Sequence, residues 1–168
     1  MMVFLLLIGG EIMQDTMNEI ATGEILNVLK EAFEGAGESS YFTDSGPEAG
    51  LFGTVASLDA ATASRPLGGS SIAAHVHHVN FGLEVSAAWI RGDRAQRDWN
   101  ESWSVARVDE SRWSDLRQTL QARYTELLDA VEEHSADGTE SMGGTVGALA
   151  HVAYHLGAIR QKIAVTRD

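Results

Sequence analysis

Residues 111 to 133 read SRWSDLRQTLQARYTELLDAVEE and carry the clearest helical pattern of the chain. Large apolar side chains recur there at steps of three or four positions: Trp113, Leu116, Leu120, Tyr124, Leu127 and Val131. Because an α-helix completes a turn in about 3.6 residues, these side chains line one face. The segment therefore predicts a long amphipathic helix that buries this face in a core.

Three other stretches have a similar apolar period. They cover about residues 16–34, 70–91 and 145–165. Asp15 is a candidate N-cap of the first helix, and either Ser70 or Ser71 can cap the second. The sequence thus predicts four long helices.

The segments between these helices carry turn chemistry. Residues 35–50 and 135–144 are polar and rich in glycine, and residues 98–103 form a tryptophan-rich connection. Residues 58–64 predict one or two helical turns before a proline. No stretch alternates with a period of two, so strands are not expected. We expect an all-α fold, a four-helix bundle with an irregular crossover connection.

Composition and charge exclude several classes of protein. The chain has 168 residues, the size of one domain, and a formal net charge of -12. This negative charge argues against binding nucleic acid phosphates or anionic membrane lipids. The chain has no cysteine, so a transition-metal site must use imidazole or carboxylate ligands. We expect a cytoplasmic protein with neither nucleic acid nor membrane as a partner.

The N-terminus begins with an unbroken apolar run at residues 1–8. A membrane-spanning helix takes about 20 residues, and the run lacks the basic start and cleavage site of a secretory signal. Three interpretations stay open: a mis-annotated start with initiation at Met13 or Met17, a buried or dimer-packing extension, and a degenerate signal. We treat residues 1–14 as an apolar extension and residues 15–168 as a single domain.

Five of the six histidines fall in two clusters, His75, His77 and His78 in the second predicted helix and His151 and His155 in the last. Residues four positions apart lie one turn apart on the same helix face. Both imidazoles of the last pair can therefore reach one metal ion. Ordinary hydrogen bonding at the edge of a core is the alternative for such a pair.

Helical geometry narrows the candidates in the first cluster. Measured around the axis from the apolar Ile72, His75 lies at about 60° and His78 at about 120° on the same side. His77 lies nearly opposite and is expected at the surface. His75 and His78 are therefore both candidate ligands.

Three histidines from two helices would leave a coordination position open to water or substrate, as catalytic sites do. Imidazole suits Zn, Ni, Fe or Cu. The metalloprotease motif is excluded, because Val152 stands where that motif has its general-base Glu. The tryptophans are expected as anchors of the core and loops rather than as a ligand cage: Trp89, Trp99, Trp103 and Trp113.

Three stretches together resemble the DinB-like superfamily. They are SIAAHVHHV at residues 71–79, the Asp-Trp and Ser-Trp pairs within residues 98–103, and AHVAYHLGAIRQ at residues 150–161. The resemblance covers about residues 15–165. It implies a four-helix bundle with an irregular crossover, often dimeric, that binds a divalent metal through one histidine of helix two and an HxxxH pair of helix four.

Carried onto this chain, the resemblance implies His78, His151 and His155 as the metal ligands. The family's helix-two ligand precedes an aliphatic residue in the second of two histidine-bearing turns, which favours His78 over His75. Characterised relatives include mycothiol-dependent maleylpyruvate isomerase and bacillithiol S-transferases. In these the metal would activate a thiol cofactor.

The resemblance leads to two hypotheses for function. The first is a divalent-metal-dependent enzyme with Zn or Ni, a thiol-dependent S-transferase or a hydrolase, acting on a small molecule with or without a low-molecular-weight thiol. The second is a non-catalytic, stress-associated protein that binds a metal or small ligand. A homodimer is expected from the family, and no catalytic residue is assigned.

Overall fold

The computed structural model describes residues 2–134 and 139–166, and all its regular elements are helices. Within these ranges it contains six α-helices, two 3-10 helices and no β-strand. The predicted all-α class is therefore confirmed. Among the described residues, no helix is both long enough and apolar enough to cross a membrane.

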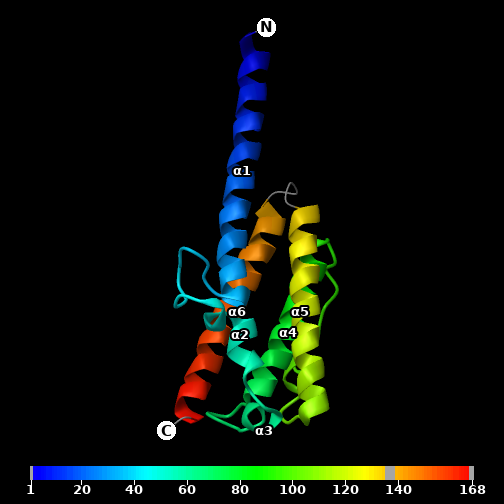
Figure 1. Ribbon diagram of the computed structural model, residues 1–168. Coiled ribbons are helices and arrows are strands. Elements are labelled where there is room, and N and C mark those ends of the chain that lie inside the picture. The colour runs from blue at the N-terminus through cyan, green and yellow to red at the C-terminus, as the bar shows by residue number, and fades with distance from the viewer. Residues whose placement is uncertain (1, 135–138, 167–168) are drawn as a thin grey trace.

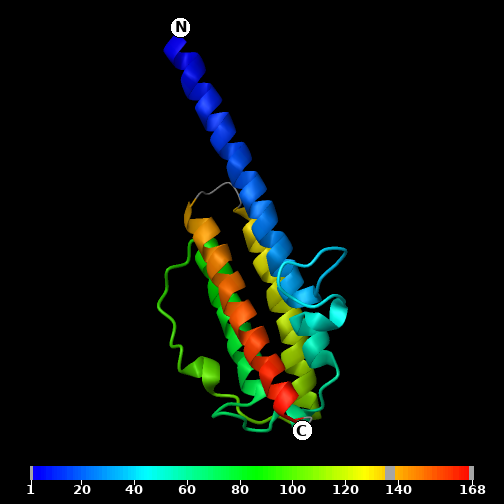
Figure 2. The same ribbon diagram turned by 90° about the vertical axis from the view of Figure 1, so that its left-hand side faces the viewer.

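Four long helices make the body of the molecule: α1 (Met2–Glu34), α4 (Ile72–Ile90), α5 (Glu110–Glu133) and α6 (Thr139–Thr166). Helix α4 packs against both α5 and α6, and α1 packs against α6. Figures 1 and 2 show the four helices alongside one another, with the N-terminal part of α1, in blue, projecting beyond the others. Contacts of His75 with His155 and of His78 with His151 place the N-terminal half of α4 directly beside α6.

The apolar stripe of α5 is buried, as its periodicity predicts, from Trp113 to Val131. The Trp113 ring is fully inaccessible, and its Nε1 donates a hydrogen bond to the Leu58 carbonyl at 2.7 Å. Fully buried residues of the other long helices complete the core: Leu29, Phe33, Val79, Leu83, Val152 and Ile159. Burying such side chains stabilises a fold by about 1.5–3 kcal/mol each.

Side chains cap the starts of α4 and α5. The Ser71 Oγ accepts a hydrogen bond from the Ala74 backbone N–H at 3.1 Å, which confirms one of the two serines predicted to cap this helix. The Asp109 carboxylate accepts one from the Arg112 N–H at 2.8 Å. Each cap satisfies a backbone donor that the helix leaves without a partner, typically worth about 1 kcal/mol.

Helix α6 begins at Thr139, so the prediction of a break through Gly144 and a start at Thr145 is wrong. Gly144 lies inside the helix, where a Cβ would come within 2.9 Å of Ile90 Cγ1 on α4. The glycine thus permits a close contact between two helices. That contact offsets the weak intrinsic helix propensity of glycine, about 1 kcal/mol.

Helix α1 begins at Met2, so the predicted start at Thr16 with Asp15 as its N-cap is also wrong. The apolar N-terminal run contains strong helix formers and no proline, so the helix continues through it. Its end at Glu34 agrees with the prediction and is followed by Gly35 at φ +85. The division of the chain into an extension and a domain stays a prediction.

Four short helices occupy the connections: η1 (Pro47–Ala49), α2 (Leu51–Ala56), α3 (Ala60–Ala63) and η2 (Glu101–Trp103). Helix α3 falls within the turns predicted at residues 58–64. Helix α2 was not predicted, because six residues are too few to show a helical period. Its Phe52 ring packs at 5.3 Å from the rings of both Phe33 and Tyr124, which joins α2 to α1 and α5.

Glu31 of α1 holds the loop that follows this helix. Its buried carboxylate accepts hydrogen bonds from the backbone N–H groups of Tyr41, Phe42 and Thr43 at 2.7–2.9 Å, and from the Thr43 and Ser40 hydroxyls. Burial alone would raise the pKa of Glu31, but the hydrogen bonds outweigh it and lower the pKa to about 2. The ionised carboxylate is therefore the form that the fold selects.

Replacing Glu31 with Gln is expected to destabilise the protein by about 2–3 kcal/mol at pH 7, because the amide turns donors toward N–H groups that need an acceptor. Urea unfolding measures this change. The stability from Glu31 is present above pH 4.5 and is lost as pH falls toward 2, so the difference from wild type should shrink over that interval. Glu24→Gln, which replaces an exposed carboxylate that accepts from the Tyr41 hydroxyl, is the control. Equal stability of Glu31→Gln and wild type at pH 7 would contradict this account.

Candidate metal centre

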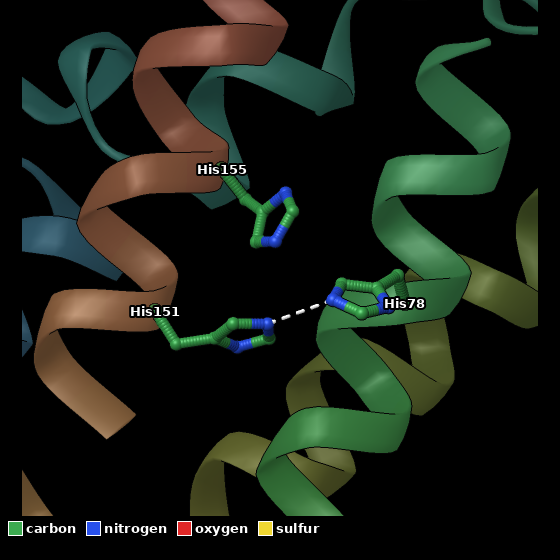
Figure 3. A group of neighbouring side chains, drawn as sticks. All are labelled: His78, His151 and His155. Carbon is green, nitrogen blue, oxygen red and sulfur yellow. Dashed lines mark hydrogen bonds between the residues drawn. The ribbon is translucent and has the colours of Figure 1, made fainter. Parts of the chain in front are cut away.

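Three histidines from two helices converge at the α4–α6 contact. His78 lies on α4, and His151 and His155 lie one turn apart on α6. Their candidate ligand nitrogens all lie within 4.8 Å of one another, and Figure 3 shows the three rings turned toward a common point. The structure thus brings together the three residues selected from the sequence. A bound metal at these residues stays a prediction.

A glycine on α4 makes room for the His151 ring. A Cβ added at Gly82 would lie 2.7 Å from His151 Nδ1 and would also collide with Cε1 of the same ring. Gly82 is buried in the middle of α4, one turn after His78, on the face that carries this ligand candidate. The absence of a side chain there lets His151 lie against the backbone of the neighbouring helix.

Ser102 fixes the orientation and tautomer of His78. The Ser102 hydroxyl donates to the Trp99 carbonyl at 2.6 Å, so its oxygen has to accept in the 2.7 Å contact with His78 Nδ1. His78 therefore carries its proton on Nδ1 and leaves Nε2 with a free lone pair. This Nε2 atom points toward His151 in Figure 3, and it is the atom that a metal ion would use.

The His151 ring completes one contact across the site. Its Nε2 lies 2.9 Å from His78 Nε2, the dashed line in Figure 3. Because His78 Nε2 carries no proton, His151 Nε2 is the donor in this contact. An ion held between the two rings would replace this proton, so the contact marks the place where a cation fits.

His155 is buried and is held from behind by His75. The Nδ1 atoms of the two rings lie 2.8 Å apart, and His75 Nε2 lies 2.9 Å from Ser70 Oγ. The Nε2 atom of His155 faces the other two rings in Figure 3. His75, the alternative ligand that helix geometry left open, contacts His155 rather than the common point of the three rings.

Burial keeps all four rings neutral. It lowers the pKa of His155 to about 3 and those of His78 and His75 to about 4, and it also lowers the pKa of His151. Repulsion from the neighbouring histidines lowers the first two further, and the charge of Lys162 acts on His75. A neutral imidazole is the form that binds metal, so the site is ready to bind near pH 7.

Two tryptophans of the connection after α4 cover the histidines. The Trp103 ring stacks on His78, with ring centroids 4.1 Å apart and an interplanar angle of 21°. The Trp99 ring contacts His78 at 5.8 Å and His151 at 6.3 Å. Both indoles remain 41–46% exposed. These two rings therefore form a partly exposed aromatic wall beside the site.

The donor set fits a divalent transition metal. Three neutral imidazoles converge, and within the described part of the chain the cluster includes no carboxylate and no fourth protein ligand. Three protein ligands leave a coordination position open, which is the arrangement of catalytic rather than structural zinc sites. The imidazole set alone does not select one metal among Zn, Ni, Cu and Fe.

The remaining histidines have other positions. His77 was expected at the surface but is partly buried, and its Nδ1 lies 2.8 Å from the Ser102 carbonyl oxygen. His134 follows the end of α5, apart from the cluster. Sequence reasoning missed Gly82 and Ser102. Gly82 offered a signal as a glycine one turn after a candidate ligand, and Ser102 as a serine between two tryptophans.

Comparisons with models of protein families, with curated proteins and with solved structures found no match. The resemblance to the DinB-like superfamily therefore stays a prediction.

Gly82→Ala is expected to weaken metal binding at least tenfold while leaving the helical content intact, because the methyl group displaces the His151 ring. The substitution itself favours the helix by about 0.5–1 kcal/mol. Chelator competition measures the affinity, and circular dichroism the helix. Gly147→Ala is the matched control, since it lies on α6 one turn before His151 and a Cβ there meets nothing within 4 Å. Equal affinities of the two variants would show that Gly82 does not shape the site.

Proposed function

We propose that this chain is a DinB-like, divalent-metal-dependent enzyme that uses His78, His151 and His155 to bind Zn or Ni. Its fold in this proposal is a four-helix bundle with an irregular crossover connection, made by α1, α4, α5 and α6. The observation that carries the proposal is the convergence of three neutral imidazoles, with ligand nitrogens within 4.8 Å of one another, from two neighbouring helices.

A divalent ion at this site would lower the pKa of a bound thiol or water and supply a nucleophile near pH 7. The protein's own part is orientation. Ser102 holds His78 through Nδ1, and Gly82 admits the ring of His151. Buried rings and the absence of a clustered carboxylate leave the positive charge of an ion unneutralised by the described ligands, which favours an anionic fourth ligand such as a thiolate.

A thiol-dependent S-transferase or a hydrolase is the reaction class that we propose. The chain has no cysteine, so a thiol nucleophile has to come from a small molecule. Trp99 and Trp103 offer partly exposed rings next to the histidines, and Tyr154, 72% exposed, packs with its ring 5.0 Å from that of His155. These rings can contact the apolar part of a small substrate while its reactive group lies at the site.

A non-catalytic role is the second candidate. The observation that favours it is the lack of a general base in the cluster, where the described ligands are all histidines and the Ser102 hydroxyl is committed to the Trp99 carbonyl. In this role the protein would bind a metal or small ligand under stress without turnover. Turnover measurements separate the two roles.

The proposal also includes a homodimer located in the cytoplasm, with a small molecule rather than nucleic acid or membrane as the partner. The family resemblance supports the dimer. The net charge of -12 supports the exclusion of phosphate backbones and anionic lipid surfaces as partners.

Protein purified without a histidine tag or added metal is expected to contain close to one divalent ion per chain, measured by elemental analysis. The double variant His151→Ala, His155→Ala should lose the ion and keep its helical circular dichroism. His134→Ala, outside the cluster, is the matched control and should keep the ion. Wild-type protein that neither contains an ion nor binds added Zn or Ni would refute the metal site.

Substituting cobalt for the native ion makes thiol binding visible. Mycothiol or bacillithiol is expected to add a thiolate-to-metal charge-transfer band, and Trp99→Ala should weaken this binding several-fold with unchanged metal content. Trp89→Ala is the control, because Trp89 has a similar exposure but stacks under Arg94. Unchanged spectra with every thiol would refute the S-transferase proposal, and absence of turnover with bound thiol would favour the non-catalytic role.

A further inference from the structure

His75 makes two hydrogen-bonding contacts that link the metal site to the start of α4. Its Nδ1 lies 2.8 Å from His155 Nδ1, and its Nε2 lies 2.9 Å from Ser70 Oγ. His75 and His155 are 6% and 3% exposed, so water does not readily replace the contact between their Nδ1 atoms. Both ring nitrogens of His75 are thus engaged, and neither is free to bind an ion.

The contact between the two Nδ1 atoms has two allowed directions. One Nδ1 has to carry a proton and the other has to accept it, because two bare or two protonated nitrogens repel. If His75 donates, neutral His155 carries its own proton on Nε2 and cannot bind a metal through that atom. If His155 donates, its Nε2 has a free lone pair facing His78 and His151.

The direction of the hydrogen bond between His75 and His155 is not fixed by a neighbouring group, unlike the direction of the hydrogen bond at His78. The Ser102 hydroxyl donates its hydrogen bond to the Trp99 carbonyl, so the tautomer of His78 is fixed with or without an ion. The hydroxyl of Ser70 can rotate and either accept from His75 Nε2 or donate to it. The chain of Ser70, His75 and His155 therefore remains reversible.

We propose that His75 is a positioning residue, whose Nδ1 accepts a hydrogen bond from the His155 Nδ1–H and thereby presents His155 Nε2 to the metal. The Ser70 Oγ accepts a hydrogen bond from the His75 Nε2–H and completes the chain. This inference rests on the proposed metal site. In many metal sites, the ligand histidine forms a hydrogen bond through its other ring nitrogen, and this bond fixes the ring. Removing that hydrogen-bond partner typically weakens metal affinity by about 10–100-fold. We assign this role to His75.

Lys162 of α6 supports the same geometry. Its Nζ donates to the Leu67 carbonyl and, at 3.1 Å, to the Ser70 carbonyl, which holds the short turn before α4. The turn therefore holds Ser70 within hydrogen-bonding distance of His75 Nε2.

Two substitutions of His75, by the nearly isosteric residues Asn and Leu, test the role of its Nδ1 as a hydrogen-bond acceptor. His75→Asn places its Oδ1 where His75 has Nδ1, whereas His75→Leu fills the same space without an acceptor. We expect His75→Leu to weaken zinc binding about 10–100-fold at an unchanged ratio of one ion per chain. We expect His75→Asn to stay within a few-fold of wild type. Competition with a chromogenic chelator measures both, and His134→Asn controls for the loss of a histidine elsewhere.

Nitrogen-15 NMR of the histidine rings provides an independent readout. In the zinc-loaded wild type, His155 and His78 should show a protonated Nδ1, and His75 a protonated Nε2 with a bare Nδ1. Equal affinities of the Leu and Asn variants, or a protonated Nδ1 on His75, would overturn the proposal. Complete loss of the ion in both His75 variants would overturn it as well, because His75→Asn keeps the acceptor. Wild-type protein without zinc affinity would refute the proposed function itself.

Discussion

The close packing of α6 on α4 is the contact on which the site depends. Gly144 faces Ile90 near one end of this contact, and Gly82 faces His151 near its middle. A Cβ at either glycine would meet atoms of the opposite helix at less than 3 Å. Two small residues on opposite helices thus set how near the helices come, and this separation decides whether imidazoles from both can reach one point.

Burial and hydrogen bonding act together on the histidines. Removing an imidazole from water disfavours its charged form, so the rings stay neutral and keep lone pairs. Ser102 contacts His78 through its Nδ1, and His75 contacts His155 through its Nδ1. Each of these contacts directs the Nε2 atom of the ligand ring inward. Neutral nitrogens facing one another without a proton between them repel. The arrangement is therefore complete only when a proton or a cation lies among them.

Much of the fold follows from local patterns. The stripe on residues 111–133, the cap at Ser71 and the end of α1 were each predicted, because periodicity and capping depend on neighbours in sequence. The start of α6 and the whole of α2 were not. Gly144 is tolerated in a helix through its contact with α4, and α2 is held by the rings around Phe52. Neither cause is visible in a local stretch of sequence.

The sequence by itself determined the helical class, the helix faces and the pairing of His151 with His155, since spacing along a helix sets which side chains share a face. Helix geometry left His75 and His78 as alternatives on one side of α4, and the family resemblance favoured His78. Only the tertiary structure placed His78 at the common point and His75 behind His155. The reason is physical, because helix periodicity sets only the direction in which a side chain leaves its helix. The distance between α4 and α6 and the loop that carries Ser102 decide which ring nitrogens of the histidines come into contact.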